Sequence, residues 1–169
     1  GSTAVIATFR EDDDINATEV LGRLIFSGSD VGTAATRKTG ALIAATASAD
    51  WSSSGTSHQP TDLQFYTQDA ADADSLGAPR MTIDDGGKVG IGTVSPDTLL
   101  HVLGTGANGE ITVERDSGTE MLFQSQAALG TIGTQSNLDL ALKVNASTAM
   151  IIKNDLNVGM GTTVPAGDL

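Results

Sequence analysis

Acidic side chains are the most abundant ionisable groups in this chain, which has 21 Asp and Glu residues. Two segments are rich in them, EDDD at residues 11–14 and DAADADS at residues 69–75. Carboxylates can bind calcium, and a fixed pair of them can cleave a glycosidic bond. The first segment lacks the calcium-loop spacing D-x-[DN]-x-[DN]-G, and the second is small, polar and rich in turn formers. We predict solvated acidic turns at both places.

The chain has two histidines, His58 and His101, and neither stands in a zinc or nucleophile motif. One histidine per chain could form a three-histidine metal ring in a trimer, but a structural or exposed histidine is the default. The segment GTGANG at residues 104–109 matches a dinucleotide-binding fingerprint. A strand-like segment, EITVERD, follows it where that fingerprint needs a helix. We therefore predict no catalytic, cofactor-binding or metal-binding residues, and no enzyme.

A single tryptophan, Trp51, begins a polar segment that also holds His58. Aromatic faces stack on sugars, although a lone ring more often anchors a small core. The segments 50–61 and 69–79 are predicted loops. We name Trp51 and His58 as possible contacts with a surface ligand on these loops.

Composition excludes several classes of partner. The net charge is −12 with only nine basic residues, so nucleic acid and anionic membranes are unsuitable partners. No apolar run approaches the roughly 20 residues of a membrane span. The chain is 39% hydrophobic but only 4% aromatic, so a single copy would build a thin core. Assembly into an oligomer is a standard remedy for a thin core.

Short apolar segments separated by turn residues at intervals of roughly 8–12 residues predict an all-β fold. Several of them alternate apolar and polar residues, as strands with one buried face do. The segment ALIAATASA could instead be helical by propensity alone. The expected strands are 20–27, 40–47, 62–67, 80–84, 88–93, 99–103, 109–115, 120–125, 129–134, 137–144, 149–153 and 157–161.

An internal repeat connects two glycine-containing segments. MTIDDGGKVGIGTVSP (residues 81–96) aligns with MIIKNDLNVGMGTTVP (residues 150–165), so that Met81 falls on Met150 at an offset of 69 residues. Glycine weakens a strand interior, which indicates a requirement for it here. As strands, these segments would present apolar side chains on one face and bare glycine on the other, which lets another backbone approach. A loop or bulge is the alternative.

The stretch RMTIDDGGKVGIGTVSPDTLLHV (residues 80–102) resembles a segment found in many bacteriophage tail fibre and tailspike proteins. The resemblance extends over residues 20–165, but the second copy has Met160 and Val164 in place of isoleucine and serine and lacks the apolar strand after Pro165. Such modules form elongated, intertwined homotrimers that often precede an intramolecular chaperone, for which no signature is evident here. The resemblance implies close packing of three chains at the glycine motifs. The residues implicated are Val89, Gly90, Ile91, Gly92, Val158, Gly159, Met160 and Gly161.

We expect an N-terminal leader or cap at residues 1–19, a first β module at 20–98 and a second at 99–169. Because the chain opens with Gly1-Ser2, we expect a fragment of a longer protein. The expected function is a structural and adhesive part of a tail fibre, located in the virion. Its expected partners are two further copies of itself, other fibre segments and a host surface glycan or receptor. The alternatives are a depolymerase that cleaves host polysaccharide and a non-viral trimeric adhesin.

Overall fold

The computed structural model describes residues 15–28, 38–51, 58–69 and 76–165, and all regular elements among them are strands. The chain divides into two compact units, Gly1–Leu103 and Gly104–Leu169. The predicted boundary lies after residue 98, whereas the division falls after Leu103. The difference arises because the strand at residues 100–102 pairs with the strand at residues 89–91 of the first unit. The acidic segment at residues 11–14 and residues 70–75 of the second acidic segment lie outside the described residues.

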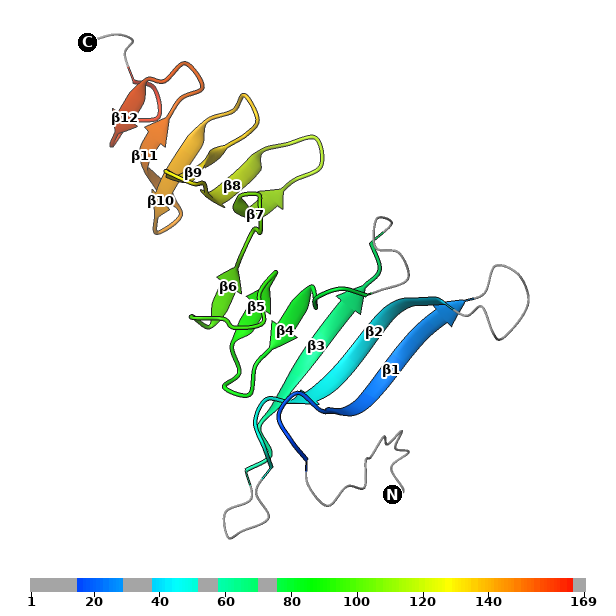
Figure 1. Ribbon diagram of the computed structural model, residues 1–169. Coiled ribbons are helices and arrows are strands. Elements are labelled where there is room, and N and C mark those ends of the chain that lie inside the picture. Colours follow the sequence, from blue (N-terminus) through cyan, green and yellow to red (C-terminus); the bar gives the residue numbers. More distant parts are fainter. Residues whose placement is uncertain (1–14, 29–37, 52–57, 70–75, 166–169) are drawn as a thin grey trace, which may run out of the picture. The chain divides into compact units, whose positions relative to one another are not determined.

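The described residues of the first unit form one six-stranded sheet, with its strands in sequence order (Figure 1). Neighbouring strands are antiparallel except for the last pair, which is parallel. The strands are β1 (Val20–Gly28), β2 (Lys38–Ala47), β3 (Thr61–Thr67), β4 (Met81–Ile83), β5 (Val89–Ile91) and β6 (Leu100–Val102).

In the second unit, the described part of the chain forms two three-stranded antiparallel sheets. The first contains β7 (Gly109–Glu114), β8 (Glu120–Ser125) and β9 (Gly130–Thr134), and the second contains β10 (Leu140–Val144), β11 (Ser147–Ile152) and β12 (Val158–Met160). Asn145 and Ala146 join β10 to β11 with φ angles of 49° and 63°. Two successive positive φ angles indicate the type I′ turn that suits the twist of a tight hairpin.

The predicted all-β class is confirmed, and each expected segment contains a strand. The segment around Ala44 is the strand β2 because it pairs with β1 on one side and with β3 on the other. Those ladders supply hydrogen bonds and packing that outweigh the helix propensity of alanine.

The internal repeat is a structural repeat with the same register in both copies. Met81 pairs with Ile91 in β4–β5, and Met150 pairs with Met160 in β11–β12. The connecting turns also match. The Gly87 N–H donates to the Asp84 carbonyl, and the Leu156 N–H donates to the Lys153 carbonyl, each at 2.9 Å.

A third strand belongs to each copy of the repeat. In the first copy, the Asp85 N–H donates to Asp62 Oδ1 of β3 at 3.1 Å. In the second, the Asn154 N–H donates to Asp139 Oδ1 beside β10 at 3.0 Å. The repeated unit is therefore the three-stranded sheet β3–β4–β5 or β10–β11–β12. The connection from its first to its second strand comprises residues 68–80 in one copy and two residues in the other.

Candidate assembly interface

The glycine motif allows the chain to cross the face of its own strand. β6 lies parallel to β5, so residues 92–99 must carry the chain back to the start of β5. On this path the Thr93 carbonyl oxygen passes over Gly90, where a Cβ atom would lie only 2.4 Å from it. Real Cβ atoms do not come that close, so only glycine fits at this position.

The second glycine of the motif has a different role. Gly92 has a φ of 75°, a left-handed conformation that residues with a side chain rarely adopt. A Cβ on Gly92 would also lie 2.2 Å from the Leu103 carbonyl oxygen beyond β6. Gly92 therefore both starts the crossover and leaves room for the strand that follows it.

The second copy repeats the arrangement at its own glycines. A Cβ on Gly159 would lie 2.5 Å from the Thr162 carbonyl oxygen, and Gly161 has a φ of 68°. The prediction that the two glycines of each motif share one face of a strand is therefore wrong, because β5 ends at Ile91 and β12 at Met160. The loop alternative describes the motif better. The chain's own threonine carbonyl fills the space above Gly90 and Gly159.

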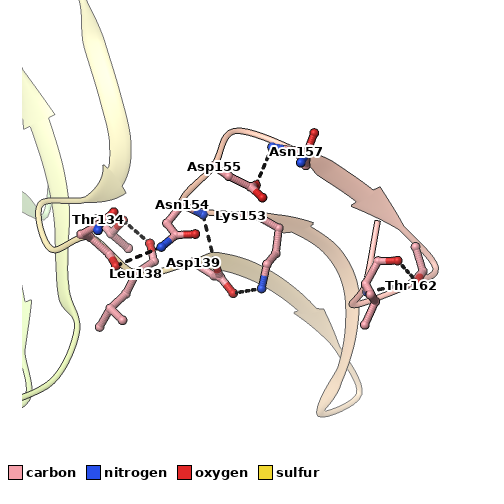
Figure 2. A network of polar contacts seen from close by, with 10 residues as sticks. Thr134, Leu138, Asp139, Lys153, Asn154, Asp155, Asn157 and Thr162 are labelled. Atoms are coloured by element: carbon pink, nitrogen blue, oxygen red, sulfur yellow. Dashed lines mark hydrogen bonds and ion pairs between the residues drawn. The ribbon is translucent and has the colours of Figure 1, made fainter. Parts of the chain in front are cut away.

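Polar contacts hold the crossover in its path. The Ser95 N–H donates to Thr93 Oγ1 at 3.1 Å, and the Val164 N–H donates to Thr162 Oγ1 at 3.2 Å. Thr162 lies at the end of the β11–β12 hairpin in Figure 2. In the first copy, Lys88 Nζ also donates to the carbonyl of the buried Pro96 at 3.0 Å. The threonine after the glycine pair is thus part of the motif. Its presence in both copies was the sequence signal for this structural role.

One face of the first unit's sheet carries rows of apolar side chains. The ladder registers align one row across all six strands, and it consists of Leu24, Ile43, Phe65, Met81, Ile91 and Val102. The adjacent row crosses five strands and consists of Ala45, Leu63, Ile83, Val89 and Leu100. We call these two rows the apolar face of the first unit, and neither holds a charged residue.

Each sheet of the second unit has a similar apolar face. In β7–β8–β9, Ile111, Phe123 and Ile132 form one row across the strands. In β10–β11–β12, Leu142, Met150 and Met160 form another. The next residues on these faces, Val113, Val144 and Val158, are also apolar and exposed.

These faces remain in contact with solvent in the single chain. Leu24 is 56% exposed, Ile132 is 63% exposed and Met160 is 79% exposed. Among the described residues, the buried apolar side chains are Ile15, Ala44, Ala47, Leu122 and Ile151, together with Pro96 of the crossover. Burying a half-exposed leucine or isoleucine yields about 1 kcal/mol. Apolar patches of this extent mark an interaction surface in soluble proteins.

The predicted packing residues take two kinds of position relative to these faces. Val89, Ile91, Val158 and Met160 lie in or beside the apolar rows, and all but Val89 are exposed. Gly90 and Gly159 lie on the opposite side of their strands, where they are buried beneath the crossover. The contact of any of these residues with a neighbouring chain stays a prediction.

The predicted surface-ligand residues lie at the two ends of the segment 51–58. Trp51 is half-buried, and its indole Nε1 donates to the Pro60 carbonyl at 3.3 Å. Its backbone N–H donates to the carbonyl of the buried Ile15 at 2.8 Å. Trp51 is therefore held to the rest of the unit by its own hydrogen bonds, while His58 is exposed. Ligand contact at Trp51 and His58 stays a prediction.

The carboxylates of the two copies stand in different electrostatic surroundings. Burial raises the pKa of Asp62, the Asp85 N–H opposes this, and the negative charges of Asp85 and Asp84 add to the rise. In the second copy Lys153 replaces Asp84, and its Nζ donates to Asp139 Oδ2 at 2.5 Å (Figure 2). This contact, together with the Asn154 N–H, lowers the pKa of Asp139.

Sequence reasoning did not show that Asp62 and Asp139 hold equivalent positions in the two copies of the repeat. The dipeptide Asp-Leu stands near the start of the first strand of each repeat, as Asp62-Leu63 in β3 and as Asp139-Leu140 at the start of β10. That dipeptide was the available signal. A constant offset of 69 residues does not align it, because the connections between the first and second strands differ in length.

Within the part of the chain that the structure describes, no cluster of three or more His, Asp or Glu residues has a geometry suited to a metal ion. The same residues contain no helix long and apolar enough to cross a membrane. No protein-family model matches this chain, and none of the curated proteins to which it was compared matches it.

Proposed function

We propose that this chain is a structural and adhesive segment of a bacteriophage tail fibre, that it assembles as a homotrimer, and that it has no enzymatic activity. The observation that carries the proposal is the six-stranded apolar row from Leu24 to Val102, which the single chain leaves partly exposed. A second copy that presents the same row is a partner of matching chemistry. The number of copies, three, comes from the resemblance of residues 20–165 to tail fibre modules.

Charge favours self-association through these faces. The chain carries a net charge of −12, yet the apolar rows contain no charged side chain. Joining three copies through the rows would bury apolar surface and leave the acidic residues in water. The acidic outer surface would then keep separate fibres apart in solution.

The adhesive role rests on display of loops by a rigid β support. Loops that a scaffold positions carry binding residues more often than the scaffold itself does. The segments that contain Trp51 and His58, and the connection between β3 and β4, are the proposed display surfaces. Three identical sites on one fibre would raise avidity for a repeated host surface glycan or receptor. The segment would accordingly be located in the virion, next to other fibre segments.

Light scattering of the purified protein tests the assembly. We expect a mass near three times the chain mass of 17.2 kDa. A change of Val113 to Asp, on the apolar face of β7, should lower the mass because it places a charge in the interface. The matched control is Thr112→Asp, on the adjacent and opposite-facing residue of the same strand, which should leave the mass unchanged. A monomeric mass for a protein with folded circular dichroism would overturn the proposal.

A further inference from the structure

β5 and β12 are equivalent strands with different outer neighbours. Each is the last strand of a three-stranded repeat, and each pairs with its hairpin partner in the same register. β5 has β6 on its outer side, parallel to it. β12 is an edge strand in the part of the chain that the structure describes.

The contacts of β6 on β5 define what this outer edge holds. The Val89 N–H donates to the Leu99 carbonyl at 2.9 Å, and the Leu103 N–H donates to the Ile91 carbonyl at 2.9 Å. Leu100 lies beside Val89 and Val102 lies beside Ile91, so β6 extends both apolar rows by one residue. An added strand thus gains both backbone hydrogen bonds and apolar contacts.

β12 presents the same groups without an incoming strand among the described residues. Val158 is equivalent to Val89 and Met160 is equivalent to Ile91. The space beside Gly161 gives the clearest contrast. A Cβ on Gly92 would meet the Leu103 carbonyl oxygen, whereas a Cβ on Gly161 meets no described atom within 4 Å. Gly161 leaves room for a carbonyl group that its own described surroundings do not supply.

We propose that the outer edge of β12 binds a parallel, extended apolar strand supplied by the adjoining segment of the fibre. Strand addition of this kind is a recurring mode of recognition, in which main-chain hydrogen bonds give affinity and alternate side chains give specificity. The incoming strand carries apolar residues at the two positions equivalent to Leu100 and Val102. The backbone carbonyl that follows them by one residue lies against Gly161.

The identity of the partner as a fibre segment rests on the proposed function, but the strand addition itself does not. The exposure of Met160 supports an apolar strand in particular. Met160 is 79% exposed, while its equivalent Ile91, covered by β6 on one side, is 38% exposed. A strand on β12 would cover Met160 as β6 covers Ile91.

Hydrogen–deuterium exchange on an extended chain tests the inference. Residues 166–169 are replaced by the sequence of residues 97–104, DTLLHVLG, so that Pro165 precedes the same strand that follows Pro96. We expect exchange of the segment 157–161 to slow by about tenfold, because the Val158 N–H gains the partner that Val89 has. Linking the strand to the chain gives it a high effective concentration.

Two control variants of the extended chain isolate the cause. Replacing the added residues equivalent to Leu100 and Val102 by Asp should restore fast exchange, because the apolar contacts are lost. Gly161→Ala should also restore fast exchange, because the new Cβ takes the place of the incoming carbonyl oxygen. The same substitution in the original chain measures the strain that its φ of 68° imposes without an added strand, and that smaller effect is subtracted. Unchanged exchange in the extended chain, or exchange already slow in the original chain, would overturn the inference. Light scattering reports the trimer separately, so its failure is distinguishable from this one.

Discussion

The carbonyl oxygen of Thr93 occupies the position that a side chain on Gly90 would need. A Cβ atom at Gly90 would lie 2.4 Å from that oxygen, and the same relationship recurs between Gly159 and Thr162 at 2.5 Å. Both glycines are therefore required by the path of their own chain. The glycine motif is a device for crossing a strand at close range.

Substitution of Gly90 by Ala should destabilise the first unit by about 2 kcal/mol, because the backbone must shift to accommodate the methyl group. Gly159→Ala should have a similar effect on the second unit. Gly130→Ala is the control, since a Cβ there meets nothing within 4 Å in β9 and its φ is not positive. Urea denaturation should show the loss at both crossover glycines and none at Gly130. Equal stability of all three variants would contradict the crossover account.

Leu156→Gly should stabilise the second unit by about 1 kcal/mol. Leu156 has a φ of 71°, and a left-handed conformation costs a residue with a side chain roughly 1–2 kcal/mol. The equivalent residue in the first copy, Gly87, has a φ of 80° and carries no such strain. Leu156 is 82% exposed in the single chain, so little packing is lost. Thermal denaturation measures the change, and a loss of stability would show that Leu156 packs against another chain.

The contributions of Asp62 and Asp139 to stability should respond to acid in opposite directions. Asp62 has a folded-state pKa above the ordinary aspartate value of 3.8, so it disfavours folding at neutral pH. This penalty disappears as the pH falls through the folded-state pKa. Asp139 has a folded-state pKa below 3.8. Its contribution is present above that value and is lost as the pH falls through the folded-state pKa.

Asn substitutions separate these two effects. Asp62→Asn keeps an acceptor oxygen for the Asp85 N–H and should raise the stability of the first unit at pH 7. Asp139→Asn breaks the ion pair with Lys153 and should lower the stability of the second unit at the same pH. Denaturation followed between pH 3 and pH 7 checks both signs. Parallel pH profiles for the two variants would show that the surroundings of the two carboxylates do not differ as described.

Lys88→Met should lower the free energy of local opening of the first crossover by about 1 kcal/mol, because it removes the hydrogen bond from Nζ to the Pro96 carbonyl. Methionine keeps the aliphatic part of the side chain. The second copy has Asn157 at the equivalent position, and Asn157→Met serves as the comparison. Exchange of the amides at residues 92–99 measures the loosening. Unchanged exchange in Lys88→Met would show that the contact does not hold the loop.

Alternation and turn composition were sufficient to predict the strands, because the apolar rows of these sheets follow the two-residue period of a strand. The repeat was also visible, since Met81 and Met150 begin equivalent hairpins. The role of Gly90 was not visible, because the group that excludes a side chain is the Thr93 carbonyl, and every residue has a carbonyl. The parallel placement of β6 was missed for a related reason. The apolar pattern of residues 99–103 would be the same for a parallel and for an antiparallel strand. Only the path of residues 92–99 decides that β6 is parallel to β5.

The unequal connections inside the repeat have a practical consequence. The first and second strands of the repeat are joined by residues 68–80 in one copy and by Asn145-Ala146 in the other, yet both copies keep the same hairpin register and the same carboxylate contact. The three-stranded frame thus tolerates an insertion at this one place. Foreign peptides grafted between Asn145 and Ala146 would be carried on an intact scaffold, which makes the module a cassette for engineering new binding specificities.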